Sequence, residues 1–392
     1  MQDATGPESR QAPTRVLIGS PAIGLVPDPT PQGVILLDLG PDHPSRAGLL
    51  ELRIWPDGDL VGRAEVIVGA MHRGAEKLYE VRDYRQILML ADRHDWQAPA
   101  AAELAIALAC EQLLGLEVPA RAQWLRTLLA EHTRITSHLG FLGYLWTLAG
   151  LESPVPRLRE RLREQLQSLT GNRVHPMINR LGGLAADADD QWLITEGSVV
   201  EDGLAIADQA AELIMSLTEA SDRIPRLGPE LIKAYGVSGP AARAGGVDLD
   251  LRISKPYLCY PELQSELVLP TVHRDGSVQS RLALLAAEVR SSVRIIQRCI
   301  ERLHEVGGPV SVRLGKIVKL PEGEIYAATE APLGAAGCYL VSRGEKTPWR
   351  LKLRTPSFNN VAALEALLPG CPIDDLELLM ASCGYVVGDI DK

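Results

Sequence analysis

One apolar stripe constrains the fold of this chain more than any other feature. Between Arg281 and Leu303, apolar side chains recur at spacings of 3, 4, 4, 3, 4 and 3 residues; they are Leu282, Leu285, Val289, Val293, Ile296, Ile300 and Leu303. This period places them on one face of a long helix. Such a face must be buried against other helices, so the stripe predicts a bundle with this helix across its middle.

Four other segments also have a helical pattern. The composition agrees, because 46% of the residues are hydrophobic but only 4% are aromatic, as expected for helices that pack closely through short side chains. The segments are Ala100–Leu116, a stretch that begins at Ala120, Pro154–Leu169 and Ser198–Ser221.

Strand patterns flank the helical region on both sides. Leu49–Ile54 and Leu60–Val66 are joined by Pro-Asp-Gly-Asp at 56–59, a composition typical of a tight turn, so we predict an antiparallel hairpin. Further on we expect strands at 324–327, 337–342 and 349–354, followed by short helices at 360–368 and 372–383.

These elements predict an α+β fold. Residues 1–33 are rich in Pro, Gly, Ser and Gln, and we expect a flexible N-terminal arm there. Residues 34–392 should form a single body, with a hairpin region at 34–74, a central long-helix bundle at 75–306 and a mixed strand and helix region at 307–392.

Charge and composition exclude several classes of function. The formal net charge is −10 and the isoelectric point about 5.4, which argues against a nucleic-acid surface. No stretch approaches the uninterrupted apolar length of a membrane span, so membrane contact is expected only through partners. The six cysteines include no Cys-x-x-Cys pair, and we interpret them as reduced thiols that bind no metal.

Several motifs occur in a characteristic order. Gly-Pro-Asp-His-Pro stands at 40–44, Met-His-Arg-Gly-Ala-Glu-Lys-Leu at 71–78 and Val-Gly-Asp-Ile-Asp-Lys at 387–392, with further motifs at 119–126, 131–139, 180–183, 236–247, 330–334 and 355–358. Through them the chain resembles the D subunit, or 49 kDa subunit, of respiratory NADH:quinone oxidoreductase, complex I. That family is related to the large subunit of nickel-iron hydrogenases.

The resemblance implies a fold, partners and a location. It implies a nickel-iron hydrogenase large-subunit-like fold and a peripheral place on the cytoplasmic side of the cell membrane. The expected partners are a B-type iron-sulfur subunit with a 4Fe-4S cluster, a C-type peripheral subunit and a membrane H-type subunit. The chain would bind no cofactor itself, would be inactive alone, and would form with the B-type subunit the wall of a quinone chamber.

The hydrogenase relatives hold their metals on two Cys-x-x-Cys pairs. By the resemblance, those pairs would fall near Arg93–Trp96 and Cys383–Val386. This chain offers only Cys383 there, so the ligand count excludes a nickel-iron site.

At the positions that contact quinone in the family, the residues differ. By alignment, Ala47 stands in place of a His, Trp96 in place of a Tyr, and Leu148 in place of an Asp that pairs with the His. A methyl group cannot donate a proton, and an indole N–H is a very weak acid. The chamber has therefore lost its usual proton donors.

Neighbouring residues offer two substitutes. Arg46 and His94 lie next to the altered positions and could supply a donor; the alternatives are a solvated loop charge and a histidine packed in a helical region. His43 belongs to the same loop, where it either holds backbone groups in place or acts on the quinone. The quinone-chamber candidates are thus His43, Arg46, Ala47, His94, Trp96 and Leu148.

A second group of residues is expected near the partner's cluster. By resemblance this group contains His72, Arg73 and Arg93, since a fixed cation there would raise the potential of the cluster. The alternative for Arg73 is an ion pair with Glu76 or Asp92. Arg121, Arg134 and His138 are expected on polar faces of long helices, as anchors between helices or subunits; these three form a separate set.

Two functions follow from these observations. The first is a D-type subunit of an NADH:quinone oxidoreductase-like complex that encloses a quinone-type acceptor. The alternative is a non-catalytic scaffold subunit that docks a B-type iron-sulfur protein on a membrane module.

Overall fold

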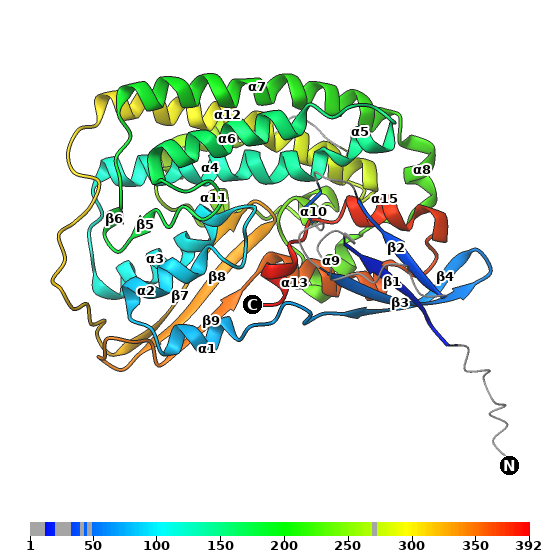
Figure 1. Ribbon diagram of the computed structural model, residues 1–392, viewed down its shortest axis with the longest axis horizontal. Helices are drawn as coiled ribbons and strands as arrows, with labels where there is room; N and C mark the ends of the chain where they lie inside the picture. The colour runs from blue at the N-terminus through cyan, green and yellow to red at the C-terminus, as the bar shows by residue number, and fades with distance from the viewer. Residues whose placement is uncertain (1–11, 20–32, 40–42, 45–48, 269–272) are drawn as a thin grey trace, which may run out of the picture.

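The computed structural model describes residues 12–19, 33–39, 43–44, 49–268 and 273–392. Long helices form one layer, and two sheets with short helices lie beneath it (Figure 1). This mixed arrangement of helices and strands confirms the predicted combination of a bundle with strand regions at both ends. Among the described helices, none combines the length and apolar content needed to cross a membrane.

The predicted hairpin is confirmed. Strands β3 (Leu50–Asp57) and β4 (Leu60–Ile67) pair antiparallel, and Gly58 in the turn between them has a φ of 62°. They form one side of a sheet with the strand order β2-β1-β3-β4.

Part of the predicted flexible arm is a strand instead. β1 (Thr14–Ile18) pairs in parallel with β2 (Val34–Leu37) and antiparallel with β3. Val16 and Ile18 are fully buried. The apolar run at 16–18 gives this short segment enough surface to bury in the sheet, so the prediction of a flexible arm was wrong for these residues.

The long helix predicted from the apolar stripe crosses the middle of the bundle. It is α12 (Val278–Glu305), which begins after Ser277, whose side chain accepts a hydrogen bond from the Ser280 N–H. It packs most extensively against two other helices and buries its apolar stripe between them. The other bundle helices are α4 (Ala120–Leu142), α6 (Val155–Thr170) and α7 (Asp190–Met215).

A C-terminal sheet lies under the bundle, with α3 (Pro99–Leu114) between them. Its strands are β7 (Gly323–Ala331), β8 (Gly334–Ser342) and β9 (Arg350–Arg354), paired antiparallel in that order. The Ala-rich helix α3 packs on β7 and β8, as its small side chains allow. The three predicted strands are confirmed, and β7 and β8 are longer than predicted.

Short elements connect these layers. Each predicted C-terminal helix is divided in two, giving α13 (Pro356–Ala362), α14 (Leu364–Leu367), η4 (Ile373–Asp375) and α15 (Leu376–Ala381). The final helix α16 (Val387–Ile390) packs against α13. The remaining elements are α1 (Ala75–Glu80), α2 (Tyr84–Ala91), α5 (Tyr144–Leu148), β5 (Asn179–Arg180), β6 (Gly183–Leu184), α8 (Thr218–Arg223), α9 (Pro229–Tyr235), α10 (Gly239–Ala244), α11 (Leu251–Ser254) and η3 (Tyr260–Leu267).

Candidate functional site

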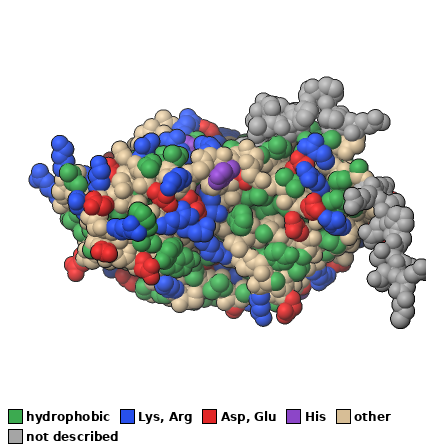
Figure 2. Space-filling view, turned by 90° about the horizontal axis from the view of Figure 1, so that it is seen from below, with side chains coloured by type: hydrophobic (Ala, Val, Ile, Leu, Met, Phe, Trp, Pro, Cys, Tyr) green, Lys and Arg blue, Asp and Glu red, His purple; other side chains and the backbone are tan. Residues whose placement is uncertain are grey.

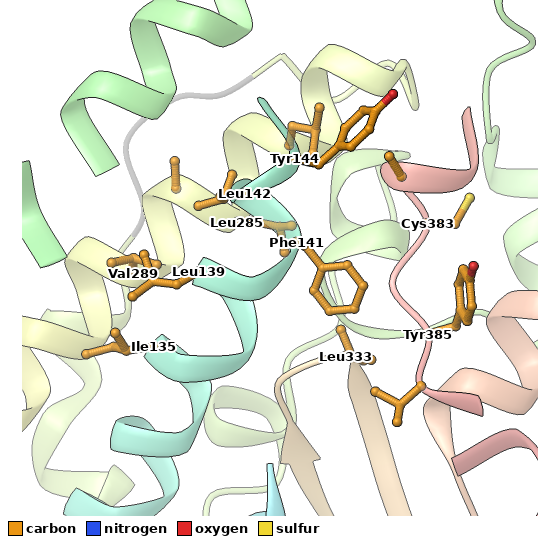
Figure 3. Close-up of a cluster of buried hydrophobic side chains, with 14 of the residues drawn as sticks. Ile135, Leu139, Phe141, Leu142, Tyr144, Leu285, Val289, Leu333, Cys383 and Tyr385 are labelled. Carbon is orange, nitrogen blue, oxygen red and sulfur yellow. The ribbon is translucent and has the colours of Figure 1, made fainter. Parts of the chain in front are cut away.

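His43, the histidine of the first motif, lies inside the core. Only 2% of it is exposed, and its Nε2 lies 3.2 Å from the carbonyl oxygen of Ala381. Its ring meets Phe141 and Tyr144 edge-on, and Figure 3 shows these two rings with Tyr385 in a cluster of buried hydrophobic side chains. Burial lowers the pKa of His43 to about 3, so the imidazole is neutral and donates its Nε2–H to Ala381. This geometry favours the structural role for His43.

Two chamber candidates, Arg46 and Ala47, lie outside the described residues, and their roles stay predictions. The described start of their loop rests on α4 beside Gly140. A Cβ at Gly140 would lie 3.3 Å from Pro44 Cγ and 3.2 Å from Arg159 Cζ. Gly140 thus lets the loop approach the bundle closely.

The segment between α2 and α3 holds His94 and Trp96 against the end of the chain. The indole of Trp96 and the backbone oxygen of His94 face Gly388 in α16 so closely that no Cβ would fit there. His94 is 7% exposed, and its Nε2 lies 3.7 Å from Asp389 Oδ1. Burial, with a smaller effect from the Lys392 charge, lowers the pKa of His94 to about 4. The imidazole is therefore neutral, and its contact with Asp389 is polar rather than ionic.

Two buried carboxyl groups accompany this histidine. Asp95 accepts hydrogen bonds from the backbone N–H groups of Gln97 and Ala98, both at 3.1 Å. Burial and the negative charge of Asp389 raise the pKa of Asp95 to about 8. Burial also raises the pKa of Asp389 to about 6, although Asp389 accepts from the backbone N–H of Ser357. At neutral pH, Asp95 therefore carries a proton.

We call Asp95, Asp389 and His94 the acid cluster. It adjoins Trp96, whose indole N–H is buried and has no hydrogen-bond partner among the described residues. The sequence prediction included His94 and Trp96 but missed both acids. Asp95 is next to His94 in the sequence, so its position near the site could have been predicted. No local sequence pattern indicates that Asp389 packs against Asp95.

Leu148, the third altered position, is exposed. It is the last residue of α5 and is 42% exposed, and Leu151 beyond it is 56% exposed. Its side chain is therefore open to solvent in this chain, while His94 and Trp96 pack against α16. The predicted place of Leu148 in a chamber wall stays a prediction.

Arg73 and Arg93, which are expected near the partner's iron-sulfur cluster, lie together at the surface. Arg73 Nη2 donates to the backbone oxygen of Arg93, and Arg93 Nε donates to Asp92 Oδ1 at 3.1 Å. Asp92 is fully buried and also accepts from the backbone N–H of Met177. His175, which the sequence analysis did not consider, places its Nδ1 3.8 Å from Asp92 Oδ2. Burial and the Arg93 charge lower the pKa of His175, so its imidazole is neutral, and we call Arg73 and Arg93 the cationic edge.

The alternative partners for Arg73 are occupied elsewhere. Glu76 accepts from Arg350 Nη2 at 2.7 Å and from the Leu353 N–H, and Asp92 is held by Arg93. In the described part of the chain, Arg73 forms an ion pair with neither carboxylate.

His72 faces a different feature, a groove of about 510 Å³ beside the C-terminus. Lys352, Arg354, Phe358 and Lys392 are among the other residues that line it. The surface around α1 and β9 carries Lys and Arg side chains beside hydrophobic ones (Figure 2). The structure thus separates His72 from Arg73, its neighbour in the sequence.

Two of the expected helix anchors are fully buried. Arg134 and His138 are both 0% exposed, so the polar face of α4 that they share lies inside the protein. Their role as interhelix anchors is confirmed, because His138 Nε2 lies 3.0 Å from Glu288 Oε2 on α12. Arg121 binds Asp187 and the carbonyl oxygens of Leu303 and Val306.

The cysteines are free and buried, Cys383 included. Across the described ranges, no group of three or more His, Cys, Asp or Glu side chains is placed to hold a metal ion.

Comparison with known proteins shows which family this chain is similar to. Residues 154–319 and 311–392 match the family described as the 49 kDa subunit of respiratory-chain NADH dehydrogenase. A D subunit of the NADH-quinone oxidoreductase of Streptomyces coelicolor is 46% identical over 91% of this chain and 95% of its own length. A D subunit of the corresponding Salinispora tropica enzyme is 47% identical, with 91% and 93% covered.

More distant relatives agree. The D subunit of the Carboxydothermus hydrogenoformans enzyme is 35% identical over 91% of this chain and 98% of its own length. A chain of the membrane-bound sulfane sulfur reductase, an archaeal respiratory membrane complex, superposes with a TM-score of 0.80 and 30% identity, covering 88% of this chain and 94% of that one. The chain therefore belongs to the 49 kDa, or D, subunit family of respiratory NADH-quinone oxidoreductases.

Proposed function

We propose that this D-type subunit forms, with a B-type iron-sulfur subunit, one wall of a chamber for a quinone-type acceptor in an NADH:quinone oxidoreductase-like membrane complex. It would sit peripherally on the cytoplasmic side, with C-type and membrane H-type subunits as further partners. The observation that carries the proposal is the acid cluster beside Trp96, the position that the family resemblance assigns to a quinone contact.

Reduction of a quinone consumes protons as well as electrons, and the acid cluster can supply one of these protons. Trp96 cannot act as the acid, since an indole holds its proton too tightly. Asp95 is a protonated carboxyl group at neutral pH, and carboxylic acids with a pKa close to the working pH are efficient proton donors. Asp389, whose pKa of about 6 leaves it ionised at neutral pH, can then take up a proton to replace the one released.

The cationic edge suits a neighbouring redox centre. Arg93 is 45% exposed although buried Asp92 fixes its inner end, so its charge is held at the surface. A positive charge beside an iron-sulfur cluster stabilises the reduced cluster and raises its potential. We propose that this edge faces the cluster of the B-type subunit.

The scaffold function is the second candidate. It is favoured by the buried indole N–H of Trp96, which binds nothing among the described residues, and by the Ala and Leu aligned with the family's His and Asp. In that case the subunit would hold a B-type protein on a membrane module without reducing quinone.

One experiment separates the two. The complex is purified through a tag on this subunit, its subunits are identified, and its quinone reduction is measured with and without a quinone-site inhibitor. The chamber proposal expects a B-type subunit and inhibitor-sensitive turnover. A complex that contains the B-type subunit but has no turnover supports the scaffold, and a chain that purifies without that subunit contradicts both.

A further inference from the structure

A dense network of charged side chains lies between α4, α10, α11, α12 and β7, apart from the acid cluster. It contains four carboxylates, three guanidinium groups and one imidazole, each at most 8% exposed. Its members are Glu131, Arg134, His138, Arg243, Asp250, Arg252, Glu288 and Glu330. We call it the central network.

Most of the network consists of well-matched pairs. Glu131 binds Arg134 Nε at 3.1 Å and Arg252 Nη1 at 3.2 Å, and it accepts from Ser292 and Tyr260. Asp250 binds Arg252 through Nε and Nη2, at 3.0 and 2.7 Å. Glu288 binds Arg243 Nη2 at 2.6 Å.

Among the four carboxylates, Glu330 has the fewest hydrogen bonds and positive charges to compensate its negative charge. It receives one bond from Arg243 Nη1, at 2.7 Å, and one from the backbone N–H of Leu251. The same Arg243 nitrogen lies 3.7 Å from Asp250 Oδ2 and also donates to the carbonyl oxygen of Leu249. Two carboxylates thus share a single guanidinium nitrogen in a buried site, where like charges disfavour double ionisation.

The charge count favours one bound proton. With every carboxylate ionised, four negative charges face three positive ones, and an uncompensated charge in a dry interior is costly. One proton restores neutrality, and it can rest on His138 or on a carboxylate. Burial lowers the pKa of His138, whereas burial and the Asp250 charge raise that of Glu330. Despite burial, Arg252 and Arg243 lower the pKa of Asp250 to about 2.

We propose that the central network is a proton-binding site that holds one proton at neutral pH on the Glu330–Asp250 carboxyl pair, with Glu330 as its resting position. The neutral His138 donates its Nε2–H to Glu288, and Tyr257 and Tyr260 are the other titratable groups facing the network. The proposal does not depend on the quinone chamber. Because Glu330 lies on β7 and its partners Arg243 and Leu251 lie on α10 and α11, its ionisation would affect the packing of the sheet against these helices.

Infrared spectroscopy of the full chain tests the site. A protonated carboxyl group has its own carbonyl stretch, so the spectrum of Glu330→Gln should lack one such band at neutral pH. Asp250→Asn should lose the same band although Glu330 is still present, because it removes the charge that keeps the proton bound. The matched control is Glu111→Gln, which alters a buried one-to-one pair with Arg126 and should keep the band.

Stability supplies a second readout. An amide resembles a protonated carboxyl group, so Glu330→Gln should melt close to the wild-type temperature, whereas Glu111→Gln should melt well below it. Unchanged band intensity in Glu330→Gln overturns the proposal. So does a Glu330→Gln chain that fails to fold while Glu111→Gln folds, because that result means that Glu330 is ionised.

Discussion

His94 Nε2 and Asp389 Oδ1 lie 3.7 Å apart, and this contact joins the segment before α3 to the last helix of the chain. The contact buries three titratable groups, His94, Asp95 and Asp389, beside Trp96. A packing interface between distant parts of the sequence thus also creates a place where protons can be held.

The pH dependence of stability should report the proton on Asp95. Its folded-state pKa of about 8 is above the ordinary value of 3.8, so between these values the folded chain binds a proton that the unfolded chain releases. Stability must therefore fall as the pH rises through this window. Asp95→Asn should remove this contribution. In urea unfolding, the free energy of unfolding of the variant should therefore rise relative to that of the wild type between about pH 5 and pH 8. A constant difference would mean that Asp95 is ionised.

Gly388 should tolerate no side chain. Gly388→Ala pushes a methyl group into the Trp96 ring, and overpacking of this kind costs about 1–3 kcal/mol. Thermal denaturation measures the loss. Gly307→Ala is the control, because no atom lies within 4 Å of a Cβ at that position. Equal melting temperatures for the two variants would show that α16 can move away from Trp96.

The long helices were easier to predict from the sequence than the contacts between titratable side chains. The apolar period of residues 282–303 was enough to find α12, because a long amphipathic helix has a repeating pattern. It did not reveal Asp389 beside Asp95, since that proximity depends on how the chain end folds back. The polar face of α4 with Arg134 and His138 was predicted, but a helical pattern does not show that a partner such as Glu288 is buried opposite it.

Glu288 should contribute far more to the stability of the folded chain than a surface carboxylate does. Glu288→Gln leaves Arg243 and His138 without their charged partner in the core, and breaking a buried pair costs about 3–5 kcal/mol. Glu301→Gln removes an exposed pair with Arg298 that solvent screens, and it should cost far less. Chemical denaturation compares them, and similar losses would contradict the buried network.

The cationic edge predicts a redox effect in the assembled complex. Arg93→Gln removes a surface-held charge, so the midpoint potential of the nearest iron-sulfur cluster should become more negative. A redox titration followed by electron paramagnetic resonance measures the shift. Arg63→Gln, on the distant β4 strand, is the control for a general change in net charge. An unchanged potential in Arg93→Gln would mean that this edge does not face the cluster.

Quinone turnover of the purified complex carrying Asp95→Asn tests the central claim most directly. Asp187→Asn, in the surface pair with Arg121, serves as the control. If the acid cluster supplies protons, Asp95→Asn should lower inhibitor-sensitive turnover by about a hundredfold at neutral pH, with assembly intact and Asp187→Asn unaffected. Wild-type turnover in an assembled Asp95→Asn complex would contradict the account.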